Sequence, residues 1–376
     1  MPIQKLKNNL RIFSTEFPSD NFVLTIYANA GLIYENENNF GISHFVEHLF
    51  TSNFPQKEVN LPQYCDFTTT DDSIDLSFHF PSNRLDYFLE NIFEAMQNPN
   101  FSKTKIEAER KIIANEFRTN FEKDELYKIY PREMIGHAPL GTLKNLRKFA
   151  KSDLMAWHER IFTPENIVIG LASSPQNLKK HTHQIFAKLE KLKSKNQKPE
   201  ANQLSPLQPK SISSSENKTY VCTSLMIENL ELADLAYTIL SQKFFRLCEK
   251  LGLYNVNLER HLYNNHFQIW YWEFEESKSH SQKILCQQTA FFKNIVGKIT
   301  VLDLEKAKES STFSLETRQN SIFSRLDFVC ENLLKNEEID RQKILRKYEK
   351  VSLVEVKNFV REKIDLKKFS YSKFHN

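Results

Sequence analysis

A five-residue word, His44-Phe45-Val46-Glu47-His48, constrains this chain more than any other part of its sequence. On a helix, two histidines four positions apart lie one turn apart on the same face. Two neutral imidazoles in that arrangement can bind one zinc ion. Glu47 lies three positions after His44 and therefore projects near the same ion, where its carboxylate can accept a proton from water. The word therefore predicts a helix that carries a metal site.

The order of the residues in this word is informative. His-x-x-Glu-His reverses the better-known His-Glu-x-x-His order and is a zinc-peptidase signature in its own right. Short words also recur by chance, so the alternative is a partly exposed helix whose two histidines and glutamate bind nothing. The residues around the word help to decide between these interpretations.

The flanking residues support a helix from about residue 41 to residue 52. Ser43 or Asn39 could cap its N-terminus, since a serine or asparagine oxygen can accept hydrogen bonds from the first backbone N–H groups. Upstream, residues 22–28 have the composition of a strand and end before a glycine. The word thus follows a strand and a turn.

A third protein ligand must come from a different element, and Glu116 is the candidate. It lies in a stretch with helical periodicity, whose apolar positions are Ile106, Ile112, Ile113 and Phe117. Glu109 precedes Glu116 by seven positions, about two helical turns, so both carboxylates can face the same way. The alternative is the solvated acidic face of an amphipathic helix.

Taken together, these motifs resemble the pitrilysin- and insulinase-type zinc metallopeptidases, a family that includes the mitochondrial processing peptidase. The matching segments are residues 6–12, 41–50, 109–116, 140–141 and 162–170. The match is close over the first half of the chain and loose over the second. From His48 to Glu116 is 68 positions, which is shorter than usual in the family, and a trimmed loop at residues 55–62 accounts for the difference.

The resemblance implies a role for each residue of the site. In the family, two such histidines and the later glutamate of the pair bind zinc, which assigns the ligands to His44, His48 and Glu116. The glutamate inside the word is the general base, here Glu47. The earlier glutamate of the pair, here Glu109, supports the site. One zinc ion is the implied cofactor.

The resemblance also implies where a peptide substrate binds. Relatives have an Asn-Ala-x-Thr word that leads into an edge strand, and this edge pairs with the substrate backbone, which adds the peptide to the sheet as a further strand. The corresponding residues here are Asp66, Phe67, Thr68 and Thr69. We expect them to bind substrate, with Asp66 and Phe67 in place of the family's asparagine and alanine.

The second half departs from the family pattern at two positions. Relatives with two such halves carry an arginine and a tyrosine, seven apart, that contact the substrate and the reaction intermediate. Aligned without a gap, this chain has Cys248 and Asn255 there, and neither can replace a guanidinium or a phenol donor. A one-residue deletion would instead align Arg246 and Tyr254, eight apart. The ungapped alignment implies that a related half-size subunit supplies the pair in a heterodimer, with a homodimer as the less favoured alternative.

The length of 376 residues suits two domains. We expect a zinc-binding domain at residues 1–190, a linker rich in serine and proline at 191–218, and a second, homologous domain without metal at 219–376. Each domain should be α+β, with a mixed, mostly antiparallel sheet packed with helices. This is the processing-peptidase or LuxS-like metallohydrolase fold that the resemblance implies.

Charge and cysteine usage exclude several classes of protein. The net charge is +4 among 51 basic and 47 acidic residues, and no basic stripe with interleaved aromatics indicates nucleic-acid binding. The five cysteines are scattered without a Cys-x-x-Cys pair, so we expect reduced thiols rather than a disulfide framework or a zinc ribbon. Neither an apolar leader nor an apolar run of roughly 18 to 20 residues is visible, so we expect no membrane insertion and a cytoplasmic location.

The sequence thus predicts a zinc-dependent endopeptidase subunit that hydrolyses short or unfolded peptides. Two alternatives remain. A non-catalytic scaffold of the same fold could bind zinc and a peptide or partner, which the missing arginine and tyrosine favour and the presence of Glu47 disfavours. The other alternative is a zinc amidohydrolase that does not act on peptides, and only the metal word supports it.

Overall fold

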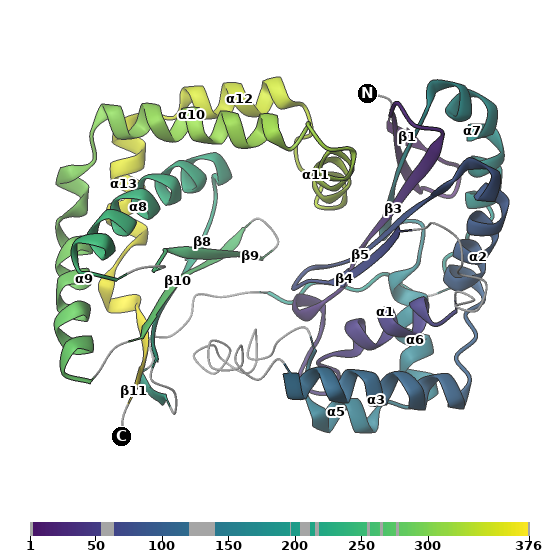
Figure 1. The fold of residues 1–376 in the computed structure, drawn as a ribbon, viewed down its shortest axis with the longest axis horizontal. Helices are drawn as coiled ribbons and strands as arrows, with labels where there is room; N and C mark the ends of the chain where they lie inside the picture. Colours follow the sequence, from purple (N-terminus) through teal and green to yellow (C-terminus); the bar gives the residue numbers. More distant parts are fainter. Residues whose placement is uncertain are drawn as a thin grey trace. The chain divides into compact units, whose positions relative to one another are not determined.

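Each of the two compact units of the chain is built around its own sheet, and Figure 1 labels most of their helices and strands. The computed structural model describes residues 3–374 with gaps at 54–63, 120–139, 196, 204–210, 215–217, 254–255, 264–265 and 276–277. The described residues within Met1–Asp124, Arg132–Asn202 and Arg318–Ile339 form the first unit. Those within Gln203–Thr317 and Asp340–Asn376 form the second unit.

The first unit contains a six-stranded sheet in the order β1-β2-β6-β3-β5-β4. Its strands are β1 (Ile3–Lys5), β2 (Arg11–Glu16), β3 (Asn21–Asn29), β4 (Tyr64–Thr69), β5 (Ser73–Pro81) and β6 (Ile167–Ser173). Neighbouring strands are antiparallel except β2 and β6, which are parallel. Among the described residues, β4 is therefore the outermost strand on its side of the sheet.

Several helices cover one face of this sheet. The helices of the first unit that precede residue 200 are α1 (Ile42–Thr51), α2 (Leu85–Gln97), α3 (Lys103–Thr119), α5 (Leu143–Lys148), α6 (Lys151–Ile161) and α7 (Pro175–Leu189). Apolar residues of α1, α2, α6 and α7 share one core with the apolar positions of β3 and β5. In β5, buried and half-buried residues alternate because successive strand residues point to opposite faces.

The opposite face is covered by α11 (Ile322–Leu334), a helix from much later in the sequence. Gly170 of β6 permits its close approach, since a Cβ atom there would lie 2.5 Å from Oγ1 of Thr25 and 2.8 Å from Sγ of Cys330. This differs from the expected boundary, which placed all of residues 219–376 in the second domain. Helical periodicity predicts that α11 has a buried face, but it does not identify the sheet that this face covers.

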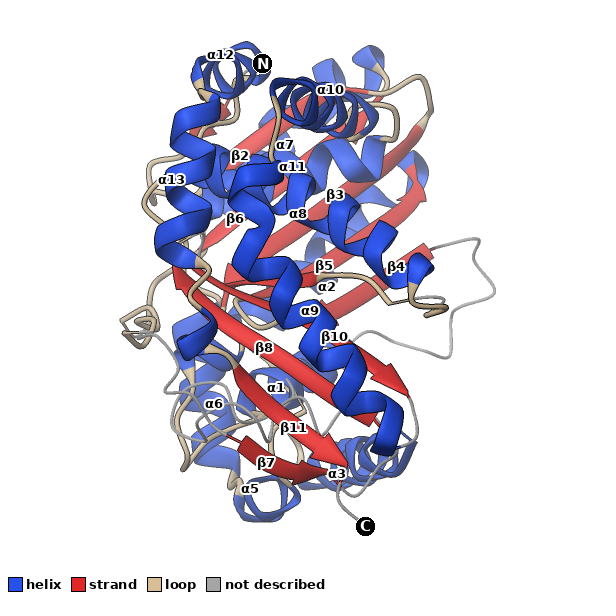
Figure 2. Cartoon of the chain, turned by 90° about the vertical axis from the view of Figure 1, so that its left-hand side faces the viewer, coloured by secondary structure: helices blue, strands red, loops and turns tan. Residues whose placement is uncertain are grey.

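The second unit contains a five-stranded sheet in the order β7-β11-β8-β10-β9, and Figure 2 shows the first four of these strands side by side. The strands are β7 (Ser211–Ser214), β8 (Lys218–Met226), β9 (Glu259–Tyr263), β10 (Phe267–Glu275) and β11 (Ser370–Phe374). The helices are α8 (Leu230–Lys250), α9 (Lys278–Lys298), α10 (Val301–Thr317), α12 (Arg341–Lys350) and α13 (Leu353–Lys363). None of the described helices is both long enough and apolar enough to cross a membrane.

One strand lies where the sequence predicts a linker. β7 falls within residues 191–218 and pairs in parallel with β11. Pairing between strands uses backbone N–H and C=O groups, which serine supplies as well as any other residue type except proline. A serine-rich segment without an alternating apolar pattern therefore gives no sign of such a strand in the sequence.

Apart from strand β1 of the first sheet, the two sheets have the same topology. In each, one parallel pair is followed by three antiparallel pairings, β2-β6-β3-β5-β4 in the first sheet and β7-β11-β8-β10-β9 in the second. In chain order, α8 follows β8 as α1 follows β3, so α8 occupies in the second unit the place of α1 in the first. The predicted α+β architecture of two related domains with mostly antiparallel sheets is confirmed.

The contact between α11 and β6 gives a test of this packing. We expect Gly170→Ala to lower the free energy of unfolding by about 1–3 kcal/mol, because the added methyl group would overlap Thr25 and Cys330. Urea denaturation measures the change. Gly297→Ala in α9 is the matched control, since a Cβ atom there meets nothing within 4 Å and alanine favours a helix. A Gly170→Ala protein as stable as wild type would contradict the close approach of α11.

Candidate metal centre

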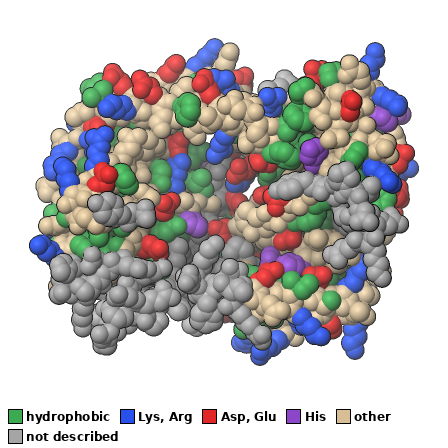
Figure 3. All heavy atoms as spheres, in the orientation of Figure 1, with side chains coloured by type: hydrophobic (Ala, Val, Ile, Leu, Met, Phe, Trp, Pro, Cys, Tyr) green, Lys and Arg blue, Asp and Glu red, His purple; other side chains and the backbone are tan. Residues whose placement is uncertain are grey.

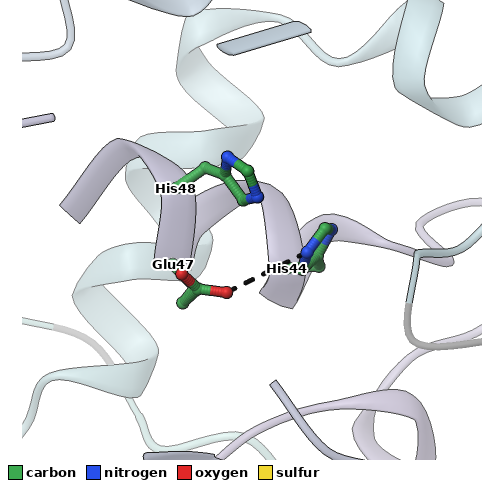
Figure 4. Close-up of side chains that lie close together, drawn as sticks. All are labelled: His44, Glu47 and His48. Atoms are coloured by element: carbon green, nitrogen blue, oxygen red, sulfur yellow. Dashed lines mark ion pairs between the residues drawn. The ribbon is translucent and has the colours of Figure 1, made fainter. Parts of the chain in front are cut away.

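Helix α1 presents the metal word on one face and core residues on the other. Phe45, Val46 and Leu49 are fully buried, which fixes the rotation of the helix about its axis. His44 and His48 consequently project from the opposite side, with side chains 13% and 16% exposed. Figure 4 shows both imidazoles and the Glu47 carboxylate on this face of the helix.

The start of α1 is held by a residue that sequence analysis missed. Gly41 precedes the helix, and its N–H donates to Oε2 of Glu35 at 2.7 Å, while the N–H of Ser43 donates to Oε1 at 2.8 Å. Glu35 is buried, and burial raises the pKa of its carboxyl group to about 7. A carboxylate at a helix N-terminus satisfies N–H groups that lack a partner within the helix. Glu35 thus does the work of a capping residue from outside the helix.

The predicted capping role of Ser43 or Asn39 is therefore wrong. Ser43 lies inside the first turn, and its hydroxyl accepts hydrogen bonds from the N–H of Gly31 at 2.9 Å and from Nε1 of Trp157 at 3.0 Å. The side chain of Asn39 instead accepts from the N–H of Asn36. The serine tethers α1 to the preceding turn and to α6, which adds a second anchor at the same end of the helix.

The two histidines and Glu116 of α3 converge on one point. Oε2 of Glu116 lies 3.6 Å from Nε2 of His44, and Oε1 lies 3.5 Å from Nε2 of His48. Around a tetrahedral zinc ion with bonds of about 2.0–2.2 Å, ligand atoms lie roughly 3.3–3.6 Å apart. The observed separations are long for hydrogen bonds but match the spacing of ligands around one ion. Two imidazole nitrogens and a carboxylate therefore fit zinc.

Glu109 contacts His48 through the ring nitrogen that does not face Glu116. Its Oε2 is 3.1 Å from Nδ1 of His48, so the other ring nitrogen, Nε2, is the one directed at Glu116. Burial lowers the pKa of His48, but the hydrogen bond to Glu109 and the nearby carboxylates outweigh it and raise the pKa overall. A carboxylate in this position fixes the orientation and tautomer of a metal-binding histidine.

The electrostatics favour a neutral His44. Burial, followed by the proximity of His48, lowers the pKa of His44 to about 3. A neutral imidazole keeps the lone pair that a metal requires. Nδ1 of His44 is buried and has no hydrogen-bond partner among the described residues.

Glu47 lies beside the two histidines, on the same helix. Its Oε2 is 4.0 Å from Nε2 of His44 and accepts a hydrogen bond from Oγ1 of Thr69 at 3.3 Å. Burial raises the pKa of Glu47 to about 7, where a carboxyl group can both accept and return a proton. Ligand atoms of His44, Glu47 and His48 lie within 4.8 Å of one another, so the Glu47 carboxylate lies close to the metal that the two histidines and Glu116 would hold.

The predicted substrate-binding residues lie on both faces of β4. Asp66 and Thr68 are exposed, whereas Phe67 packs against the core and Thr69 faces Glu47. Their role toward a peptide stays a prediction. In Figure 3, histidine side chains (purple) lie beside acidic ones (red) on the surface of the first unit in the region of α1 and α3. The side chains of His44 and His48 are 13% and 16% exposed, so solvent can reach the site.

The structure also locates part of the region where relatives carry arginine and tyrosine. Cys248 is fully buried in the core of the second unit, on α8, so it cannot contact a substrate. Arg246, from the alternative alignment, is exposed on the same helix. Tyr254 and Asn255 lie outside the described residues.

A known family matches the part of the chain that contains this site. The family model described as insulinase (peptidase family M16) matches residues 12–135. The chloroplastic stromal processing peptidase of Arabidopsis thaliana is 25% identical over 201 residues, 49% of this chain and 16% of that protein. The mitochondrial-processing peptidase subunit beta of Rattus norvegicus is 25% identical over 183 residues, 44% of this chain and 37% of that subunit. The match thus spans well under half the length of these relatives.

Two solved structures share the fold along the whole chain. A protease from Helicobacter pylori has a TM-score of 0.85 at 15% identity, covering 100% of this chain and 99% of that one. A peptidase M16 inactive domain from Pseudomonas fluorescens has a TM-score of 0.81 at 15% identity, covering 100% and 98%. At this level of identity the likeness establishes the fold alone.

The family model matches the part of the chain that carries the metal word. The solved structures of similar size extend the same architecture to the second unit. Residues 12–135, which include His44, Glu47 and His48, therefore match peptidase family M16, and the family resemblance indicated by the sequence motifs is confirmed.

Proposed function

We propose that this chain is the metal-carrying subunit of a zinc-dependent endopeptidase. The observation that carries the proposal is the convergence of Nε2 of His44 and Nε2 of His48 on the two carboxylate oxygens of Glu116, at 3.6 and 3.5 Å. These atoms come from two helices of one compact unit, α1 and α3. Three protein ligands would leave a fourth tetrahedral position for water or substrate, as in catalytic zinc sites.

The roles of the residues follow from their positions. His44, His48 and Glu116 would hold zinc, and Glu109 would orient His48 through Nδ1. Zinc would supply Lewis acidity, which polarises a peptide carbonyl and lowers the pKa of water toward neutrality. Glu47 would accept the proton that the attacking water loses and would pass it to the leaving amine.

Extended peptides are the substrate class that this site suits. β4 is an edge strand among the described residues and lies against α1, so its backbone can pair with a peptide beside the metal helix. A peptide can pair with β4 as an added strand only where it has no other fixed structure. Short or unfolded chains therefore fit better than folded proteins, in keeping with the processing activity named for the two relatives.

A second, related subunit completes the proposal. Cys248 stands where the ungapped alignment requires an arginine, and it is buried. The similarity to a subunit beta supports an enzyme assembled from half-size chains. We infer that a related chain supplies the arginine and tyrosine in a heterodimer, with a second copy of this chain as the less favoured source.

The alternative function is a non-catalytic scaffold that binds zinc and a peptide or partner. The observation in its favour is the absence of the arginine at Cys248, and one protein of the same fold is described as an inactive domain. Glu47 argues against it, because a scaffold has no need for a buried carboxylate beside the histidines. Substitution of Glu47 separates the two functions.

We expect Glu47→Gln to lower peptidase activity at least about 100-fold, because glutamine cannot accept the proton, while zinc content stays unchanged. The assay uses purified chain with a quenched fluorescent peptide, alone and mixed with a related subunit that carries arginine and tyrosine. Exposed Glu37→Gln is the control and should retain activity. Activity only in the mixture, lost in Glu47→Gln, supports the split enzyme. Equal activity of wild type and Glu47→Gln would contradict it.

Zinc affinity tests the assigned ligands independently of activity. We expect Glu116→Gln to weaken zinc binding more than Glu109→Gln, because a lost ligand costs more than a lost orienting group, which costs about 10–100-fold. Glu107→Gln, on the same helix but exposed beside Arg110, should bind zinc as wild type does. Competition with a chromophoric chelator measures each affinity. Unchanged affinity in Glu116→Gln would remove this residue from the ligand set.

A further inference from the structure

The strand that we expect to bind the peptide also contacts the general base. Thr69 is the last residue of β4, and its hydroxyl donates to Oε2 of Glu47 at 3.3 Å. We propose that Thr69 is a positioning residue that holds the Glu47 carboxylate in a fixed place relative to a peptide paired with β4. This inference rests on the proposed function, since it assigns a role within the same reaction.

Alternation along β4 directs Thr69 toward α1. Cys65, Phe67 and Thr69 are half-buried, and the first two pack against the core to which α1 contributes. Asp66 and Thr68 are exposed. Because successive strand residues point to opposite faces, Thr68 cannot reach Glu47 while Thr69 can. The chain therefore contains two threonines on one strand of which only one contacts the base.

The position of Thr69 does not depend on a bound peptide. In the antiparallel register of β4 and β5, Thr69 lies opposite Ile74, which is fully buried in the core. The backbone of Thr69 is thus fixed by the sheet. Glu47 in turn is attached to α1, whose first turn is anchored by Glu35. The hydrogen bond between Thr69 and Glu47 joins these two rigid elements.

This contact restricts the carboxylate that must take the proton. The side chain of Glu47 has three rotatable bonds and is only 9% exposed. Fixing one carboxylate oxygen removes conformers in which the base points away from the histidines, so less entropy is lost when the reactive geometry forms. A peptide paired with the outer edge of β4 would be positioned by the same strand. Strand β4 would then position both the base and the peptide.

Three variants test this role of Thr69. Thr69→Val removes the hydroxyl at nearly constant shape, Thr69→Ser keeps the hydroxyl, and Thr68→Val makes the same change on the opposite face. A hydrogen bond to a charged group contributes enough for kcat to fall about 10- to 100-fold in Thr69→Val. In Thr69→Val we expect KM and zinc content to change little, and we expect kcat of Thr69→Ser to stay within about threefold of wild type. Any effect of Thr68→Val should fall on KM and not on kcat, because that side chain does not reach Glu47.

A double-mutant cycle on unfolding, with Thr69→Val and Glu47→Ala, measures the contact without any assay of hydrolysis, since each single variant removes one partner of the hydrogen bond. We expect non-additive changes in the free energy of unfolding for this pair and additive changes when Thr68→Val replaces Thr69→Val. An unchanged kcat in Thr69→Val, a change in KM alone, or equal damage by Thr69→Ser would overturn the proposal, and so would an additive cycle. A wild-type chain that shows no peptidase activity even when mixed with the related subunit would refute the proposed function instead, and the cycle would still test the contact.

Discussion

The hydrogen bonds from the start of α1 to the buried carboxylate of Glu35 are the interaction on which the candidate site depends. Burying a carboxylate costs several kcal/mol of hydration, and the raised pKa of Glu35, about 7, reflects that cost. Two backbone N–H groups and the positive end of the helix offset part of it. Ser43, one of the two donors, directly precedes His44. The carboxylate therefore fixes the direction from which the first candidate ligand enters the site.

Two further packing contacts build the rest of the site on this anchored helix. The buried face of α1 sets the rotation of His44 and His48, and the packing of α3 against α1 brings Glu116 to both imidazoles. The second unit repeats the topology of the first, but its corresponding helix, α8, contributes Cys248 and apolar residues to a core. The same architecture thus occurs in both units. Among the described residues, only the first unit carries a candidate metal site.

Local patterns in the sequence were sufficient for much of this account. The spacing of the histidines and the helical period around Glu116 predicted the two helices, and the structure brings His44, Glu47, His48, Glu109 and Glu116 together. Contacts between distant segments could not be predicted. Glu35 reaches α1 across a turn, and nothing in its local pattern distinguishes it from a solvated acid. The placement of α11 on the first sheet and the pairing of β7 both depend on partners far away in the sequence.

X-ray absorption spectroscopy of the zinc-loaded chain tests the central claim most directly, because it reports the atoms bound to the metal. The account predicts only nitrogen and oxygen neighbours at about 2.0–2.2 Å, with outer-shell scattering from two imidazoles. The imidazole signal should halve in His48→Gln, and a variant of the distant His181 should leave it unchanged. A sulfur neighbour at about 2.3 Å, or a spectrum that His48→Gln does not change, would contradict the assignment of zinc to His44, His48 and Glu116.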